Sequence, residues 1–282
     1  MNKYENHPLQ LSCEFFPPKT EKGVEKLSTV AKELARINPE FFSVTFGAGG
    51  STQDRTADTV IKIQELTKIE TAAHLSCVGA TKNTIRDILS FYMKNNIRRI
   101  VALRGDIPSG MVEIGDFKFA SELVAFIRQE TGDHFHIEVA AYPEFHPQAK
   151  SADDDIKHFI EKVNAGANSA ITQYFFNADA YYYFIDQLES NNVSIPVTPG
   201  IMPINNFVQL ARFSDMCGAE IPRWLRKRFE SYGDDLDSIV ALGLDIITDL
   251  CEQLIKIGVP GLHFYAMNQS KNTLKIIDNL KV

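Results

Sequence analysis

The sequence predicts an α/β fold of the (β/α)8 TIM-barrel class, in which eight parallel strands alternate with helices. Eight short apolar, β-branched runs follow one another along the chain, and most are separated by segments with the 3.6-residue spacing of amphipathic helices. The early runs recur about every 30 residues, the length of one strand–helix unit. A doubly wound open sheet would show the same alternation, but the number of strands favours the barrel.

The expected strands are, in chain order, Leu9–Phe15, Phe41–Phe46, Thr71–Cys77, Arg99–Leu103, His136–Tyr142, Ser169–Tyr174, Ser194–Pro199 and Gly261–Tyr265. Helical periodicity is clear over Gly23–Ile37 and Thr84–Asn96. The gap before the last strand is roughly twice the usual unit. We therefore expect extra helices before the last strand, around Trp224 and over Asp235–Ile257.

A chain of 282 residues could hold two ordinary domains or one large barrel. No low-complexity or Pro/Gly-rich linker divides it, so residues 1–282 are predicted to form a single catalytic barrel domain. The four-residue stretch Gly47–Gly50 is not a dinucleotide fingerprint, because Thr52 stands where the third glycine would be. A plain turn after a strand is expected there.

Composition excludes several classes of protein. With 29 Lys+Arg against 36 Asp+Glu, the net charge of −7 argues against a nucleic-acid binder. The four cysteines form no CxxC pair, and no group of residues has metal-ligand spacing, so free thiols in a reducing compartment and no metal site are expected. Neither a signal-peptide core nor an apolar run of about 20 residues is present, which predicts a cytoplasmic protein without a membrane span.

Polar residues lie where the predicted strands end, which is where barrel enzymes place their chemistry. These positions are Glu14, Thr45, His74, Arg104-Gly105-Asp106, Tyr142, Gln173 and Gly200–Pro203. Each also has a structural explanation. His74 could be a structural hydrogen bonder, Asp106 could pair locally with Arg104, and Gln173 could cap a loop.

Glu14 is the strongest candidate for acid–base catalysis. It lies among aromatic residues, where loss of hydration should raise its pKa and suit it to act as a general acid near neutral pH. The alternative is pairing with a neighbouring Arg or Lys. Further along, Ser151 is a plausible helix N-cap followed by three aspartates, and Lys162 would by default be a solvated helix lysine. These patterns indicate a barrel enzyme with a polar mouth and name no reaction.

Taken together, the motifs resemble those of 5,10-methylenetetrahydrofolate reductases. The matching segments appear in family order and span about residues 10 to 270: Glu14-Phe15-Phe16-Pro17-Pro18-Lys19, Ser43–Gly50, Ala73–Cys77, Ala102–Asp106, Ala141–Pro147, Ala170–Gln173, Pro199–Pro203 and His263–Tyr265. The length matches the short bacterial type and predicts a catalytic barrel without the regulatory domain of longer relatives.

The resemblance implies a flavoprotein with FAD at the carboxyl-terminal mouth of the barrel. NADH or NADPH would reduce FAD and leave, and methylenetetrahydrofolate would then bind the same flavin face and be reduced to 5-methyltetrahydrofolate, in a ping-pong reaction. The product would feed methionine synthesis, and the chain would form a homo-oligomer. No motif distinguishes NADH from NADPH.

The resemblance also assigns roles to residues. Glu14 would be the general acid that protonates N10, and Asp106 the acidic residue beside the flavin and the pterin. Substrate contacts would come from Thr45, Asp106, Gln173, Gln209, Phe213 and Gln269. FAD contacts would come from Thr45, Phe46, Ala48, His74, Arg104, Gly105, Asp106, Ala120, Tyr142, His146, Ala149, Asp155 and Lys162.

Four of this chain's residues depart from the pattern of many relatives. Phe46 stands in place of Tyr, His158 and Glu161 in place of Asn and Arg, and Gln269 in place of Arg. Two other functions remain open: a flavin-free lyase or aldolase that uses Glu14 as acid–base, and a non-catalytic folate-binding barrel. No predicted strand ends in a Schiff-base lysine, and the intact Glu14 and Asp106 favour an active reductase.

Overall fold

A computed structural model describes residues 8–46, 50–106 and 115–281, without the side chains of residues 50–54. Within these residues all strands belong to one parallel sheet. They are β1 (Gln10–Phe15), β2 (Phe41–Val44), β3 (Glu70–Ser76), β4 (Arg99–Leu103), β5 (His136–Ala141), β6 (Ser169–Thr172), β7 (Val197–Thr198), β8 (Gly200–Ile201) and β9 (Gly261–Tyr265). Each predicted strand overlaps one of them, and β8 begins just after the predicted end of the seventh.

The strand order β7-β6-β5-β4-β3-β2-β1-β9-β8 confirms the barrel. Its two ends, β7 and β8, are the two halves of the single run predicted over Ser194–Pro199 and its continuation, so the sheet curls round until these halves meet. Pro199 separates them, because proline lacks the N–H that a ladder needs. The prediction of one seventh strand ending at Pro199 is corrected to two short strands on either side of it.

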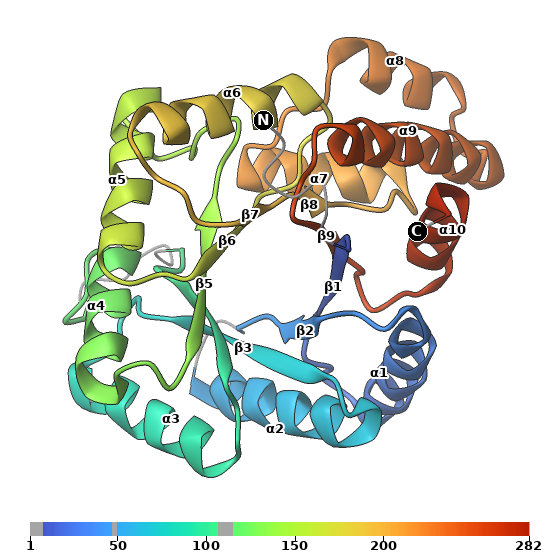
Figure 1. The fold of residues 1–282 in the computed structure, drawn as a ribbon. Coiled ribbons are helices and arrows are strands. Elements are labelled where there is room, and N and C mark those ends of the chain that lie inside the picture. Colours follow the sequence, from blue (N-terminus) through green and yellow to red (C-terminus); the bar gives the residue numbers. More distant parts are fainter. Residues whose placement is uncertain (1–7, 47–49, 107–114, 282) are drawn as a thin grey trace.

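Helices surround the barrel (Figure 1). They are α1 (Glu21–Leu34), followed by a 3-10 turn at Ala35–Ile37, α2 (Gly50–Thr67), α3 (Lys82–Lys94), α4 (Ala120–Thr131), α5 (Ala152–Asn164), α6 (Ala178–Ser190), α7 (Phe207–Cys217), α8 (Arg223–Ser231), α9 (Leu236–Lys256) and α10 (Lys271–Leu280). The expected extra helices before the last strand are α8 and α9. None of the helices in the described ranges is long and apolar enough to cross a membrane.

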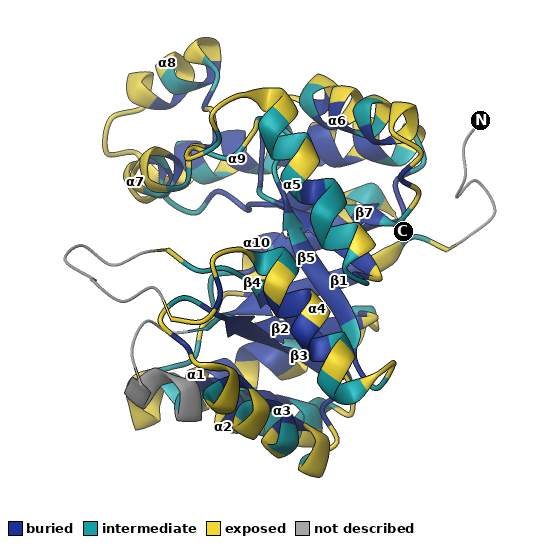
Figure 2. Cartoon of the chain, turned by 90° about the vertical axis from the view of Figure 1, so that its left-hand side faces the viewer, coloured by how far each residue is buried: buried dark blue, intermediate teal, exposed yellow. Residues whose placement is uncertain are grey.

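Polar caps fix where several helices begin. The side chains of Thr20, Thr81, Ser151 and Asn206 each accept a hydrogen bond from a backbone N–H in the first turn that follows. Ser151 is therefore the N-cap that the sequence predicted. In Figure 2 the buried residues lie on the strands and on the helix faces turned towards them, while the outer helix faces are exposed.

The amino-terminal end of the barrel is closed by a charged network. Inside the barrel, Phe41 belongs to a small apolar cluster, and the guanidinium of Arg99 lies 4.2 Å from the centre of its ring. The same guanidinium contacts the carboxylates of Glu40, Glu70 and Glu138 at 2.8, 3.0 and 2.9 Å. The carboxyl ends of the strands are consequently the end that is open for a site.

Candidate active site

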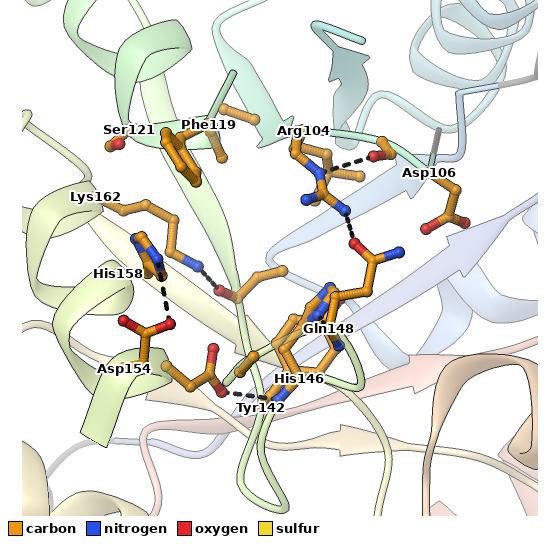
Figure 3. Close-up of a pocket in the computed structure, with 17 residues that line it drawn as sticks. Arg104, Asp106, Phe119, Ser121, Tyr142, His146, Gln148, Asp154, His158 and Lys162 are labelled. Carbon is orange, nitrogen blue, oxygen red and sulfur yellow. Dashed lines mark hydrogen bonds and ion pairs between the residues drawn. The ribbon is translucent and has the colours of Figure 1, made fainter. Parts of the chain in front are cut away.

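Two cavities lie side by side where the strands end. The first has a volume of about 290 Å³ and opens between the ends of β4 and β5 and the start of α5 (Figure 3). The second has a volume of about 380 Å³ and lies over the ends of β1, β6 and β9. Both are lined by Asp106, Tyr142, His146 and Gln148, so these four residues form a shared wall.

The first cavity gathers most of the residues predicted to contact FAD. Its lining includes Arg104, Gly105, Asp106, Ala120, Tyr142, His146, Ala149, Asp155 and Lys162. They come from the loop after β4, the start of α4, the loop after β5 and one face of α5. Because parallel strands bring their carboxyl ends to the same edge, residues far apart in sequence meet there.

Lys162 is half-buried and lines this cavity instead of being a solvated helix lysine. Its Nζ donates a hydrogen bond of 2.5 Å to the carbonyl oxygen of Ala140 on β5. Burial lowers the pKa of Lys162 to about 8, although the nearby carboxylate of Asp155 partly opposes this. A half-buried ammonium that makes no ion pair within 4.0 Å among the described residues is suited to bind an anionic group.

The loop after β5 is held in place by hydrogen bonds that also shape the shared wall. The backbone N–H of His146 donates to the carboxylate of Asp155 at 2.9 Å, and the guanidinium of Arg104 donates to the side-chain oxygen of Gln148 (Figure 3). The rings of Tyr142 and His146 meet edge to face at 4.6 Å. Arg104 thus pairs with Gln148, whereas Asp106, which could have paired with it, is exposed at the mouth.

The second cavity contains the predicted acid and half of the predicted substrate contacts. Glu14, Asp106, Gln173 and Phe213 line it. The rest of its wall is largely aromatic or sulfur-containing: Phe16, Tyr174, Met202, Met216, Cys217, Tyr265 and Met267, with Pro147 and the remaining shared-wall residues. This composition favours a flat, largely apolar ligand with a few polar groups.

Glu14 does not have the raised pKa that the sequence predicted. Its Oε2 lies 3.2 Å from Nε2 of His74 on β3 and 3.7 Å from Nε2 of His263 on β9. Burial raises the pKa of the Glu14 carboxyl, but the attraction of the two imidazoles outweighs burial and holds the pKa at about 2. Electrostatic attraction and hydrogen bonding from both histidines favour the ionised carboxylate, although neither Nε2 makes a hydrogen bond of good geometry among the described residues.

The side-chain amide of Gln173 already makes one hydrogen bond within the protein. The side-chain oxygen accepts a hydrogen bond of 3.0 Å from the backbone N–H of Tyr174. Its NH2 group is therefore the half that remains to donate to a carbonyl oxygen in the second cavity. Tyr174 is itself fixed by Ser214 on α7, whose hydroxyl lies 3.0 Å from the tyrosine hydroxyl.

Comparison with known proteins decides the family. The methylenetetrahydrofolate reductase model matches residues 1–281. This chain belongs to the methylenetetrahydrofolate reductase family. A 5,10-methylenetetrahydrofolate reductase of Escherichia coli is 40% identical over 97% of this chain and 91% of the relative. The methylenetetrahydrofolate reductase (NADH) 1 of Arabidopsis thaliana is 36% identical, and this chain spans 48% of its length.

A solved structure supports the fold. The chain resembles an uncharacterized protein from Clostridium thermocellum that binds two copies of 5-methyl-5,6,7,8-tetrahydrofolic acid. The TM-score is 0.67 at 18% identity, covering 97% of this chain and 94% of the other. The family assignment confirms the resemblance seen in the sequence. The chain is accordingly an oxidoreductase, and its fold is a barrel.

Several residues expected at the site lie elsewhere. His74 faces Glu14 and does not line the first cavity, and Thr45 and Phe46 are half-buried after β2 and line neither cavity. Ala48 lies outside the described residues. Gln209, on α7, and Gln269, after β9, are exposed and absent from both linings. Their roles in the family pattern stay predictions.

The structure also adds residues that sequence reasoning missed. Phe119, Ser121, Gln148, Asp154 and His158 line the first cavity. Phe119 and His158 stack with ring centres 4.9 Å apart, and Glu161 lies 3.0 Å from the same imidazole. His158 was noticed only as a departure from relatives. Its helical spacing from Asp154 and Lys162, four residues to either side, could have placed all three on one face of α5.

Proposed function

We propose that this chain is an FAD-dependent reductase that converts 5,10-methylenetetrahydrofolate to 5-methyltetrahydrofolate with NADH as hydride donor. The observation that carries the proposal is the shared wall between the two cavities, which puts the predicted acid and substrate residues directly beside the predicted cofactor residues. NADH is chosen over NADPH because the Arabidopsis relative is named for NADH.

The first cavity fits an anionic dinucleotide. Arg104 and the half-buried Lys162 supply positive charge for a diphosphate, and Asp155 supplies an acceptor for a ribose hydroxyl. An extended dinucleotide could reach along the shared wall, so that its ring end would lie at Asp106. FAD, when bound, supplies the chemistry that accepts a hydride from one substrate and gives it to the next.

Glu14 supplies a proton to N10 of the folate. In the open cavity its carboxyl is ionised, because its pKa is about 2. Burial opposes ionisation, so a folate that covers the cavity shifts this pKa upwards and allows the carboxyl to take up and deliver a proton. Protonation of N10 opens the five-membered ring to an iminium cation, which is the hydride acceptor.

The remaining polar residues orient and stabilise the substrate. Asp106 lies at the mouth where the cavities meet, and its negative charge favours the cationic iminium. Gln173 donates its free NH2 group to a carbonyl oxygen, a group that both a pterin and a nicotinamide carry. Phe213 offers a ring face to either substrate, which fits two ligands that use one cavity in turn.

Three wider proposals rest on the family resemblance. Residues 1–282 act as one catalytic domain, the chain assembles as a homo-oligomer, and its product feeds methionine synthesis. The family model, which matches residues 1–281, supports the first of these.

Replacing Glu14 by Gln tests the proposed function. With Glu14→Gln we expect reduction of FAD by NADH to stay within about threefold of wild type, while reduction of methylenetetrahydrofolate falls about a hundredfold or more. Stopped-flow measurement of each half-reaction under anaerobic conditions separates the two. The exposed Glu65→Gln on α2 serves as a matched control. Equal loss of both half-reactions would assign Glu14 a structural role instead.

A further inference from the structure

The loop after β9 makes an unusual contact with the loop after β1. The side chain of Asn268 forms two hydrogen bonds with the backbone of Phe16, both 2.9 Å long. Its Oδ1 accepts from the Phe16 N–H, and its Nδ2 donates to the Phe16 carbonyl oxygen. Both Asn268 and its neighbour Met267 have a φ of 53°, in the left-handed region.

This contact links the two segments just beyond the point where the backbone ladder between β1 and β9 ends. The ladder between β1 and β9 ends at the pair Glu14 and Tyr265, and Phe16 lies beyond it. The asparagine side chain ends in an amide, the same group as a peptide bond, so it can offer a donor and an acceptor to one residue. Aspartate has no donor, and glutamine is one carbon longer. Asparagine also tolerates the left-handed conformation.

The two segments that these hydrogen bonds join both form part of the wall of the second cavity. Phe16 and Met267 line this cavity together with Glu14, which is two residues before Phe16. Phe16 is 40% exposed, so packing alone holds its ring weakly. The two hydrogen bonds between Asn268 and Phe16, which we call the clamp, fix the backbone from which that ring projects.

We propose that Asn268 is a positioning residue that holds Phe16 as a wall of the substrate cavity. That this cavity binds a folate rests on the proposed function, whereas the clamp between Asn268 and Phe16 does not. In this segment the resemblance pointed to Gln269, which is exposed and outside both cavities. The loop after β9 reaches the site directly through Met267, which lines the cavity, and through Asn268, which holds Phe16 in place.

The test compares two asparagines in the same backbone conformation. Asn268→Gly removes the clamp without backbone strain, since glycine adopts a positive φ freely. Asn192→Gly is the matched control, because Asn192 is exposed, has a φ of 58°, and follows α6 at the opposite end of the barrel. Effects shared by both variants reflect added backbone freedom, and only effects specific to Asn268→Gly count for the clamp.

The first readout is hydrogen exchange and needs no activity. Pro17 and Pro18 carry no amide hydrogen, so exchange in a peptide of residues 15–18 reports mainly on Phe16. We expect this exchange to be about tenfold faster in Asn268→Gly and unchanged in Asn192→Gly. Unchanged exchange in both variants would overturn the clamp, whatever the protein's activity.

The second readout is the binding and turnover of the folate substrate. In Asn268→Gly we expect the KM for methylenetetrahydrofolate, and the Kd for 5-methyltetrahydrofolate measured by calorimetry, to rise about tenfold with little change in kcat. In a Phe16→Ala background the same change should add little, because the ring to be positioned is gone. Full additivity of the two substitutions, or a fall in kcat with KM unchanged, would overturn the positioning role. If wild-type protein bound no folate, the proposed function would fail while the exchange result stood.

Discussion

The side chain of Glu14 is held between two histidines that come from strands far apart in the chain. The sequence predicted an acid among aromatic residues and therefore a raised pKa, but His74 and His263 lower it. Local composition indicates burial, whereas the charges that face a residue across a barrel depend on closure of the sheet. The position of Glu14 in the second cavity was predictable from its place at a strand end, and its pKa was not.

His74 is the residue we expect to control that pKa. In His74→Asn the imidazole that favours the ionised carboxylate is gone while burial remains, so the pKa of Glu14 should rise from about 2 towards or above its usual 4.5. Infrared titration of the protonated carboxyl stretch, assigned with Glu14→Gln, measures this midpoint. The control is His134→Asn, since His134 lies on the loop before β5. An unmoved midpoint in His74→Asn would show that the histidine is not the cause.

Lys162 should make cofactor binding depend on pH. Its charge is present below a pKa of about 8 and is lost as the pH rises through that value. Affinity for the FAD diphosphate should therefore be constant below about pH 8 and fall above it, by at most about tenfold per pH unit. Fluorescence titration of apoprotein with FAD measures this, and Lys162→Arg should abolish the decline because arginine stays charged.

A lysine on the same helix provides the comparison. Lys157 is exposed on α5, and Lys157→Arg should keep the wild-type pH dependence. A decline that persisted in Lys162→Arg would place the titrating group elsewhere.

Among the secondary-structure elements, β7 and β8 decide whether the barrel closes. The repeating apolar runs and the helical periodicity between them were enough to predict the strands and the extra helices α8 and α9. The break at Pro199 was not predicted, because an apolar run shows neither where a ladder stops nor which strand it meets. Closure depends on contacts between β6, β8 and β9. The Gly200 N–H donates to the Thr172 hydroxyl at 2.9 Å, and the Tyr265 hydroxyl donates to the Thr172 carbonyl at 2.7 Å.

Gly200 leaves no room for a side chain at this junction. A Cβ there would lie 2.2 Å from the carbonyl oxygen of Thr172 and 2.6 Å from Cε2 of Tyr265. Gly200→Ala should therefore lower the free energy of unfolding by about 2 kcal/mol or more, measured by urea denaturation. Gly233→Ala is the control: it has open space and a positive φ, and should cost only about 1 kcal/mol. If Gly200→Ala were the milder of the two, the junction would not be tightly closed.

Over the whole molecule, the two ends of the barrel have different roles. The Arg99 network closes the amino-terminal end, and the two cavities with their shared wall occupy the other. Although the net charge is −7, Arg104 and Lys162 lie together in the first cavity. The rule that barrel enzymes place chemistry at strand ends predicted several of the residues that gather there, but it also pointed to His74 and Thr45, which line neither cavity. It could not show that the gathered residues divide between two cavities, because that depends on how the loops after β4 and β5 fold.

The central claim is that one cavity serves two substrates in turn beside one bound flavin. Its most direct test is the visible spectrum of the FAD-loaded protein under anaerobic conditions. We predict that NADH alone bleaches the oxidised flavin band, and that methylenetetrahydrofolate added after removal of NAD⁺ restores the band and yields one equivalent of 5-methyltetrahydrofolate. A flavin that NADH bleaches but methylenetetrahydrofolate fails to reoxidise, or a protein that does not bind FAD, would contradict the claim.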